Sequence, residues 1–127
     1  PGVGKHILMD VSGSMSGILG KVRTKLGAEC KNVQVAEAQD SSFTRRARMG
    51  GRLLDLLRSL PNYSMLIIVS DFQDGAEERF CADILDEARS KHVVIVLESV
   101  ERYPQPCLHE VAKDTGGHSS VGRIMRK

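Results

Sequence analysis

Apolar residues fall into two kinds of pattern that alternate along the chain. The first kind is a short apolar run, which predicts a buried strand of a parallel sheet. At residues 32–38 the assignment is more open, because Val33 and Val35 alternate with polar residues as in a half-exposed strand, while Ala36 to Ala38 would also suit a helix. We interpret this segment as a strand. The predicted strands are therefore 5–10, 32–38, 64–70 and 92–97.

The segments between these runs carry apolar residues at the spacing of one helix face. The start of one helix is well marked, since Asp74 and Glu77 have the spacing of a capping box. Pro61 ends the helix before it, and Gly116 and Gly117 stop the last one. Helices are predicted over 16–29, 53–60, 74–88 and 108–115.

Alternation of strands and helices predicts an α/β protein with a parallel sheet covered on both faces. We expect a three-layer α/β/α Rossmann-like sandwich with a mainly parallel sheet. At 127 residues the chain is long enough to bury a core without extra crosslinks, and we expect one domain over residues 1–127.

Oxygen-bearing side chains gather where the first strand ends, at Asp10, Ser12 and Ser14. Asp10 and Ser12 leave an extended segment on the same side, and Gly13 permits the turn that brings Ser14 back toward them. Asp71 ends another buried strand. Because ligands of open α/β sheets bind beyond the carboxyl ends of the strands, these residues predict a site for a hard cation, Mg²⁺ or Mn²⁺.

The pattern D-x-S-G-S after an apolar strand resembles the metal-ion-dependent adhesion site of von Willebrand factor type A (vWA) domains. Ser70-Asp71 resembles the family's second strand-end motif, and residues 108–118, which contain Thr115-Gly116-Gly117, resemble its last helix. The resemblance implies a trimmed vWA fold, with room for one strand where the family often has a hairpin.

The resemblance implies that the chain is a protein-protein interaction module without catalytic activity. Ser12 and Ser14 would bind the cation directly, and Asp10 and Asp71 would contribute charge directly or through water. One coordination position stays open for an acidic side chain of a partner protein, so the cation bridges the two proteins.

Two positions depart from the family pattern. The family supplies a threonine before its second helix, where this chain has Arg52 after Gly50-Gly51, and a guanidinium has no acceptor for a metal. Arg52 could swing away and leave a weakened site, assisted by Thr44, or pair with Asp10 or Asp71 in the cation's place. Phe72 stands where the family more often has glycine. The Ser-Asp-Phe form resembles a bacterial branch associated with MoxR-type AAA ATPases, which makes such an ATPase a candidate partner.

Other functions find less support in the sequence. The main alternative is a Mg²⁺-dependent phosphohydrolase with Asp10 as nucleophile, but such phosphatases carry a general acid two residues later, where this chain has Ser12. Arg45, Arg46, Arg48 and Arg52 suit either a solvated loop or a docking patch for an acidic protein surface. A net charge of +2 with few aromatic residues argues against nucleic acid, and no apolar run is long enough to span a membrane.

The chain has three cysteines, Cys30, Cys81 and Cys107, and they lack the paired spacings of a zinc site. An odd number cannot all pair within the chain. We therefore expect buried thiols that behave as small hydrophobes in a reducing compartment, which predicts a cytoplasmic protein.

Overall fold

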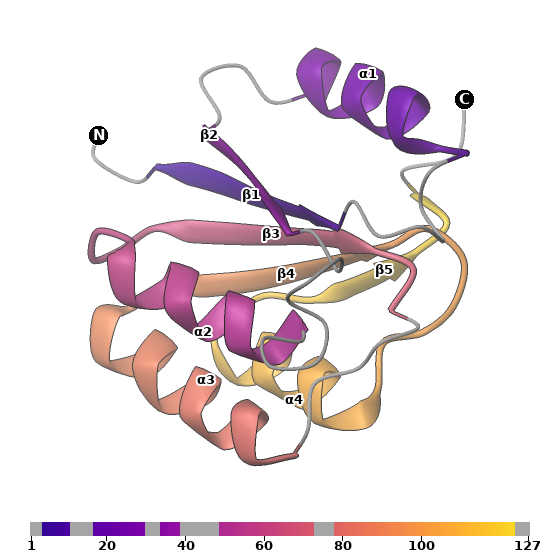
Figure 1. Ribbon diagram of the computed structural model, residues 1–127. Coiled ribbons are helices and arrows are strands. Elements are labelled where there is room, and N and C mark those ends of the chain that lie inside the picture. The colour runs from indigo at the N-terminus through magenta and orange to yellow at the C-terminus, as the bar shows by residue number, and fades with distance from the viewer. Residues whose placement is uncertain (1–3, 11–16, 30–33, 39–48, 73–77, 124–127) are drawn as a thin grey trace.

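The computed structural model describes residues 4–10, 17–29, 34–38, 49–72 and 78–123. These residues form helices and strands in strict alternation, ending on a strand (Figure 1). The elements are β1 (Lys5–Asp10), α1 (Leu19–Glu29), β2 (Gln34–Ala38), α2 (Met49–Ser59), β3 (Met65–Ser70), α3 (Glu78–Lys91), β4 (Val94–Ser99), α4 (Pro106–Asp114) and β5 (Ser119–Val121).

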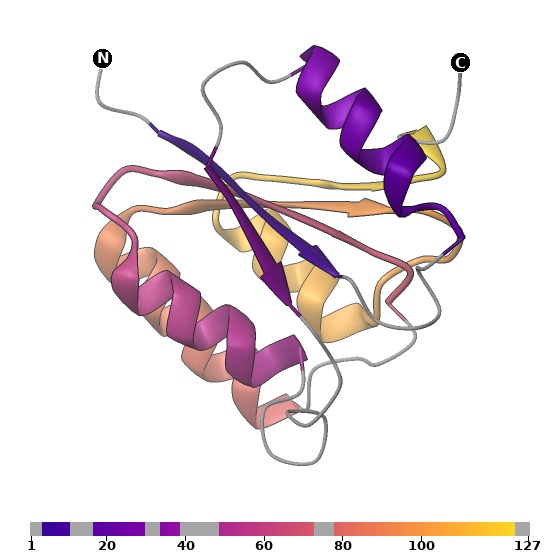
Figure 2. The same ribbon diagram turned by 45° about the horizontal axis from the view of Figure 1, so that its top comes forward.

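The strands form one five-stranded sheet in the order β2-β1-β3-β4-β5, and all neighbouring pairs are parallel. Helix α1 lies over one face of this sheet, and α2, α3 and α4 lie over the other (Figures 1 and 2). This is the predicted three-layer α/β/α Rossmann-like sandwich.

Each face of the sheet has its own apolar core, because successive side chains of a strand point to opposite faces. In β1, Ile7 and Met9 pack with Val22 and Leu26 of α1, whereas Leu8 packs toward the three-helix face. That second core is the larger one, with Leu53, Leu57, Leu66, Ile68, Ile84, Ile95, Leu97 and Leu108 among its buried members.

Most predicted elements occur where the sequence pattern put them. The segment with two interpretations is a strand, β2, and it pairs with β1. Helix α2 starts at Met49, earlier than the leucine repeat predicted, and β4 runs on to Ser99. The proposed capping box of Asp74 and Glu77 lies outside the described residues.

The edge strand β5, formed by Ser119–Val121, was not predicted from the sequence. Its side chains are only half-buried and just one of them is apolar, so neither an apolar run nor a clear alternation marks it. The strand is instead fixed by its partner, because Leu97, Glu98 and Ser99 of β4 pair with it. Within the described part of the chain, no helix is long and apolar enough to cross a membrane.

Candidate functional site

The order of the strands reverses between β1 and β3. From β1 the chain passes over one face to reach β2 on the outer side, while from β3 it passes over the other face to reach β4. In doubly wound sheets the crevice at such a switch point, beyond the carboxyl ends of the strands, is where ligands bind. The fold thus defines one preferred edge for a site.

Asp10 and Asp71 lie at this switch point. Met9 pairs with Val69 in the β1–β3 register, so Asp10, the last residue of β1, lies beside the end of β3, and Asp71 directly follows β3. Neighbouring strands are about 4.8 Å apart, so the two backbone positions are close although 61 residues separate them in the sequence. The expectation that these aspartates share one edge of the sheet is met by their backbones.

The Asp71 side chain is 2% exposed, which is unusual for a carboxylate. The backbone around it is held firmly. The hydroxyl of the preceding Ser70 accepts a hydrogen bond from the N–H of Phe72 at 2.9 Å, and the Ser70 carbonyl accepts one from the N–H of Val100 at 3.1 Å. The end of β3 is therefore a fixed platform for an acidic side chain.

Phe72 has a left-handed backbone conformation, with φ of 53°. A left-handed backbone costs a bulky residue roughly 1–2 kcal/mol, whereas glycine adopts it freely. Phe72 offsets this cost because its ring is 6% exposed within the core of the three-helix face, a burial that stabilises by about 2–3 kcal/mol. The bend after Asp71 is therefore kept by side-chain packing and not by a glycine.

A second carboxylate near this edge, Glu98 of β4, was not predicted as a site residue from the sequence. Glu98 is 3% exposed, and Arg123 holds it through a hydrogen bond of 2.7 Å from Nη2 to Oε1 and bonds of 3.1 and 3.3 Å from Nε to Oε1 and Oε2. A carboxylate engaged in this way is a structural group and a poor candidate for a metal ligand. The signal that could have found it is a lone Glu in an otherwise apolar strand.

The serine that ends β4, Ser99, is also engaged locally. Its hydroxyl donates to the carbonyl of Arg102 and accepts from the Arg102 N–H at 3.2 Å, which closes the turn after the strand. Asp71, which directly follows β3, is the other buried acidic residue described in full at this edge.

The other predicted site residues have different outcomes. Ser12, Ser14 and Thr44, and the arginines 45, 46 and 48, lie outside the described residues. Arg52 was expected in the loop before the second helix, and this placement was wrong, because Arg52 belongs to the first turn of α2. That turn follows β2, so it begins at the same carboxyl edge of the sheet as the two aspartates.

Asp10 and Asp71 lie at the ends of neighbouring strands. Oxygen is the donor that Mg²⁺ prefers, so these are residue types that a hard divalent cation would use. Among the described residues, no group of three or more His, Cys, Asp or Glu side chains could hold a metal. A cation here therefore depends on hydroxyl donors, which Ser12 and Ser14 would supply.

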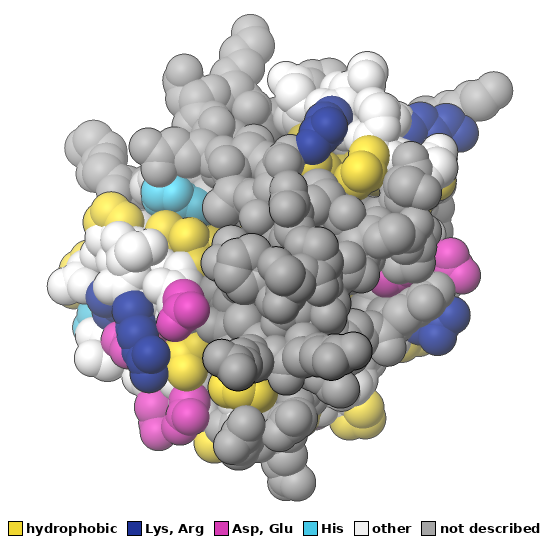
Figure 3. Space-filling model, in the orientation of Figure 1, with side chains coloured by type: hydrophobic (Ala, Val, Ile, Leu, Met, Phe, Trp, Pro, Cys, Tyr) yellow, Lys and Arg dark blue, Asp and Glu magenta, His cyan; other side chains and the backbone are white. Residues whose placement is uncertain are grey.

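A surface hollow of about 340 Å³ lies between α2 and α3, lined by Leu54, Arg58, Asp83, Asp86, Glu87 and Ser90. None of the predicted site residues lines it. Figure 3 shows acidic and basic side chains mixed over these two helices. Arg58 lies 3.8 Å from Asp55 and 3.7 Å from Glu87, so the charges of this surface partly compensate each other.

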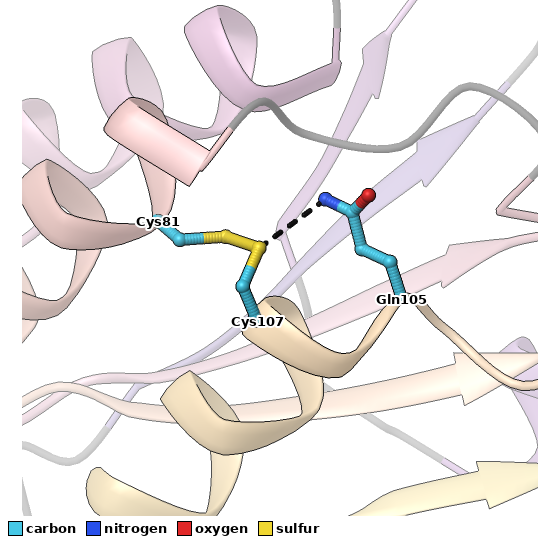
Figure 4. Close-up of a disulfide and its surroundings, with 3 residues drawn as sticks. All are labelled: Cys81, Gln105 and Cys107. Atoms are coloured by element: carbon cyan, nitrogen blue, oxygen red, sulfur yellow. Dashed lines mark hydrogen bonds between the residues drawn. A yellow bond between two sulfur atoms is a disulfide. The ribbon is translucent and has the colours of Figure 1, made fainter.

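Cys81 and Cys107 form a disulfide that joins the first turns of α3 and α4 (Figure 4). The expectation that all the cysteines carry free thiols was wrong. A reducing, cytoplasmic compartment was expected because of those free thiols, so it loses its support. Sequence spacing did not reveal the pair, because residues separated by 26 positions are brought together only by the packing of the two helices.

No family model matches the chain, and no curated protein matches its sequence.

Proposed function

We propose that this chain is a protein-protein recognition module that binds its partner through a divalent cation at the switch point of the sheet. The observation that carries the proposal is the position of Asp10 and Asp71 at the carboxyl ends of the adjacent parallel strands β1 and β3. The motif D-x-S-G-S, which resembles the adhesion site of vWA domains, adds the hydroxyl donors that such a cation would need.

In this proposal Asp10, Ser12, Ser14 and Asp71 hold Mg²⁺ or Mn²⁺. The cation supplies a Lewis-acidic position that an acidic side chain of the partner completes. The role of this chain's residues is to bind and orient. The buried Asp71 provides negative charge on a backbone that Ser70 and Phe72 fix, so little ordering is required when the ion binds.

The partner class follows from the same chemistry. A protein that offers a carboxylate suits the open position on the cation. Ser70-Asp71-Phe72 resembles the branch of vWA domains associated with MoxR-type AAA ATPases, which makes an ATPase of that type the first partner to test. Arg52 in the first turn of α2 would oppose the cation through its charge and thereby weaken its affinity.

Calorimetric titration with MgCl₂ tests the cation site. We expect wild type to bind Mg²⁺, Asp71→Asn and Ser12→Ala to weaken the affinity at least tenfold, and Arg52→Thr to strengthen it. Asp55→Asn is the matched control, because Asp55 is an exposed aspartate on α2 away from the switch point, and we expect it to leave the affinity unchanged. If neither wild type nor Arg52→Thr binds Mg²⁺, the proposal is wrong.

Two further measurements separate recognition from catalysis. Capture of a MoxR-type ATPase should weaken with EDTA and with Ser12→Ala, and capture that ignores both would contradict a cation bridge. Incubation with p-nitrophenyl phosphate should give no turnover. Mg²⁺-dependent turnover that disappears in Asp10→Asn would instead establish a phosphohydrolase.

A further inference from the structure

The disulfide between Cys81 and Cys107 joins two helices where both begin. Cys81 lies in the first turn of α3 and Cys107 in the first turn of α4, with their Cα atoms 6.0 Å apart. Both helices follow strands of the sheet, so their first turns lie toward the carboxyl edge where Asp71 follows β3. The proposed cation site makes no use of this bond.

The two sulfur atoms have different surroundings. Cys81 is 5% exposed and belongs to the core of the three-helix face, whereas Cys107 is only half-buried against that core. Cys107 is therefore the more accessible of the two residues to a small thiol in solution. Access is one of the factors that decide which sulfur of a disulfide is attacked.

The surroundings of Cys107 also favour its negatively charged form once the disulfide is broken. The side-chain amide of Gln105 donates a hydrogen bond to the Cys107 sulfur at 3.4 Å (Figure 4). Cys107 follows Pro106 in the first turn of α4, where the dipole of a helix favours an anion. The thiolate is the reactive form of cysteine, and a helix N-terminus favours its formation.

We propose that Cys81 and Cys107 form a reversible redox site that exchanges with dithiol reductants, and that Cys107 is the sulfur attacked. One thiolate of the dithiol attacks Cys107 Sγ, the Cys107–Cys81 bond breaks, and Cys81 leaves as a thiolate that takes up a proton. The second thiolate of the dithiol then attacks its own sulfur in the mixed disulfide, and Cys107 leaves as a thiolate. The products are two protein cysteines and the cyclic disulfide of the reductant.

Reduction removes the covalent tie between the first turns of α3 and α4 while the packed core of the three-helix face stays in place. Reduction therefore loosens the attachment of the start of α3 to α4. The start of α3 follows Asp71 closely in the sequence. It is independent of whether the edge of the sheet binds a cation, so the two proposals succeed or fail separately.

The first experiment asks whether the bond is reversible in the folded protein. In a Cys30→Ser background, the chain is equilibrated with ratios of reduced and oxidised dithiothreitol, quenched with iodoacetamide and weighed by mass spectrometry. We expect two alkylated cysteines at the reducing end and none at the oxidising end, with an unchanged far-ultraviolet circular dichroism spectrum. A disulfide that opens only after the chain is unfolded with urea is structural, and overturns the proposal.

The second experiment compares the two thiols, because the sulfur that forms the mixed disulfide is the one whose thiolate attacks the oxidised dithiol in the reverse reaction. Cys30→Ser/Cys81→Ser keeps Cys107 alone, and Cys30→Ser/Cys107→Ser keeps Cys81 alone. We expect iodoacetamide at pH 7 to alkylate Cys107 at least tenfold faster, and Gln105→Ala to slow that reaction. Cys81→Ala replaces Cys81→Ser if the buried hydroxyl prevents folding. Equal rates, or a faster Cys81, overturn the assignment of Cys107.

Discussion

The side-chain oxygen of Thr115 accepts a hydrogen bond from the backbone N–H of Ile95 at 3.0 Å. Thr115 follows α4 and Ile95 lies in β4, so this bond ties the end of a helix to the strand it covers. The same hydroxyl donates to the carbonyl of Ala112 at 2.9 Å. One side chain thus satisfies a strand N–H just ahead of the point where β5 begins to pair with β4.

A glycine is required at position 117 because the backbone there passes very close to the backbone of β4. A Cβ atom at this position would lie 1.8 Å from the carbonyl oxygen of Ile95, a separation that no packed structure allows. We expect Gly117→Ala to lower the free energy of unfolding by about 3 kcal/mol or more, because the strand must move. Urea unfolding followed by circular dichroism measures the change.

Gly20→Ala is the control for Gly117→Ala, since it adds the same methyl group in the first turn of α1 with nothing within 4 Å. We expect it to stabilise the protein by about 0.5–1 kcal/mol through helix propensity. Equal effects of the two substitutions would contradict the close approach at Gly117.

The hydroxyl of Thr115 is tested by replacing it with a methyl group of similar size. Thr115→Val leaves the N–H of Ile95 without this acceptor, and we expect a loss of about 1–3 kcal/mol in the free energy of unfolding. Thr115→Ser keeps the hydroxyl and should lose less. A Thr115→Val protein as stable as wild type would show that the hydrogen bond contributes nothing net.

The helices and most strands were predictable because their apolar residues repeat at the helical period or form continuous runs. The strand β5 was not, since an edge strand with half-buried side chains is defined by the strand beside it. The same holds for the disulfide, whose two cysteines meet only through the packing of α3 on α4. Long-range contacts of this kind leave no local pattern in the sequence.

The candidate site, too, was predictable only in part. Asp10 and Asp71 were placed on one edge because parallel strands bring their carboxyl ends together, and this topological argument needs only the order of the elements. The left-handed backbone of Phe72 and the buried Glu98 were beyond it. The conformation of Phe72 depends on the packing of its ring in the core, and no local pattern marks it. Glu98 is marked only by being a lone Glu in an otherwise apolar strand, and its partner Arg123 is 25 residues away in the sequence.

Lys91 at the end of α3 caps the end of α2. Its Nζ donates hydrogen bonds to the carbonyls of Leu57, Arg58 and Leu60 at 2.9, 2.7 and 2.6 Å. The last carbonyls of a helix have no partner within it and favour a cation. We expect Lys91→Met, which keeps the apolar stem, to lower the free energy of unfolding by about 2 kcal/mol.

The control for Lys91→Met is Lys113→Met. The Lys113 side chain is exposed and lies 4.0 Å from Glu110, a surface pair whose loss should cost less than about 0.5 kcal/mol. Urea unfolding of both variants at neutral pH measures the difference. If Lys91→Met proves no more destabilising than Lys113→Met, the three hydrogen bonds do not stabilise the packing of α2 on α3.

The pair of Glu98 and Arg123 connects the chain after β5 to the buried part of β4. Because Glu98 is buried and the Arg123 side chain is 47% exposed, the two residues respond unequally to substitution. Arg123→Met leaves a carboxylate buried without its guanidinium, and we expect a loss of about 2 kcal/mol, which is less than for a fully buried pair because water reaches the arginine side. Glu98→Met/Arg123→Met removes both charges and should recover part of that loss.

Arg102→Met, which removes an exposed arginine 3.9 Å from Glu101, is the control and should change stability by less than about 0.5 kcal/mol. Urea unfolding at pH 7 ranks the three variants, and a double variant less stable than Arg123→Met would show that the buried carboxylate is not the source of the cost.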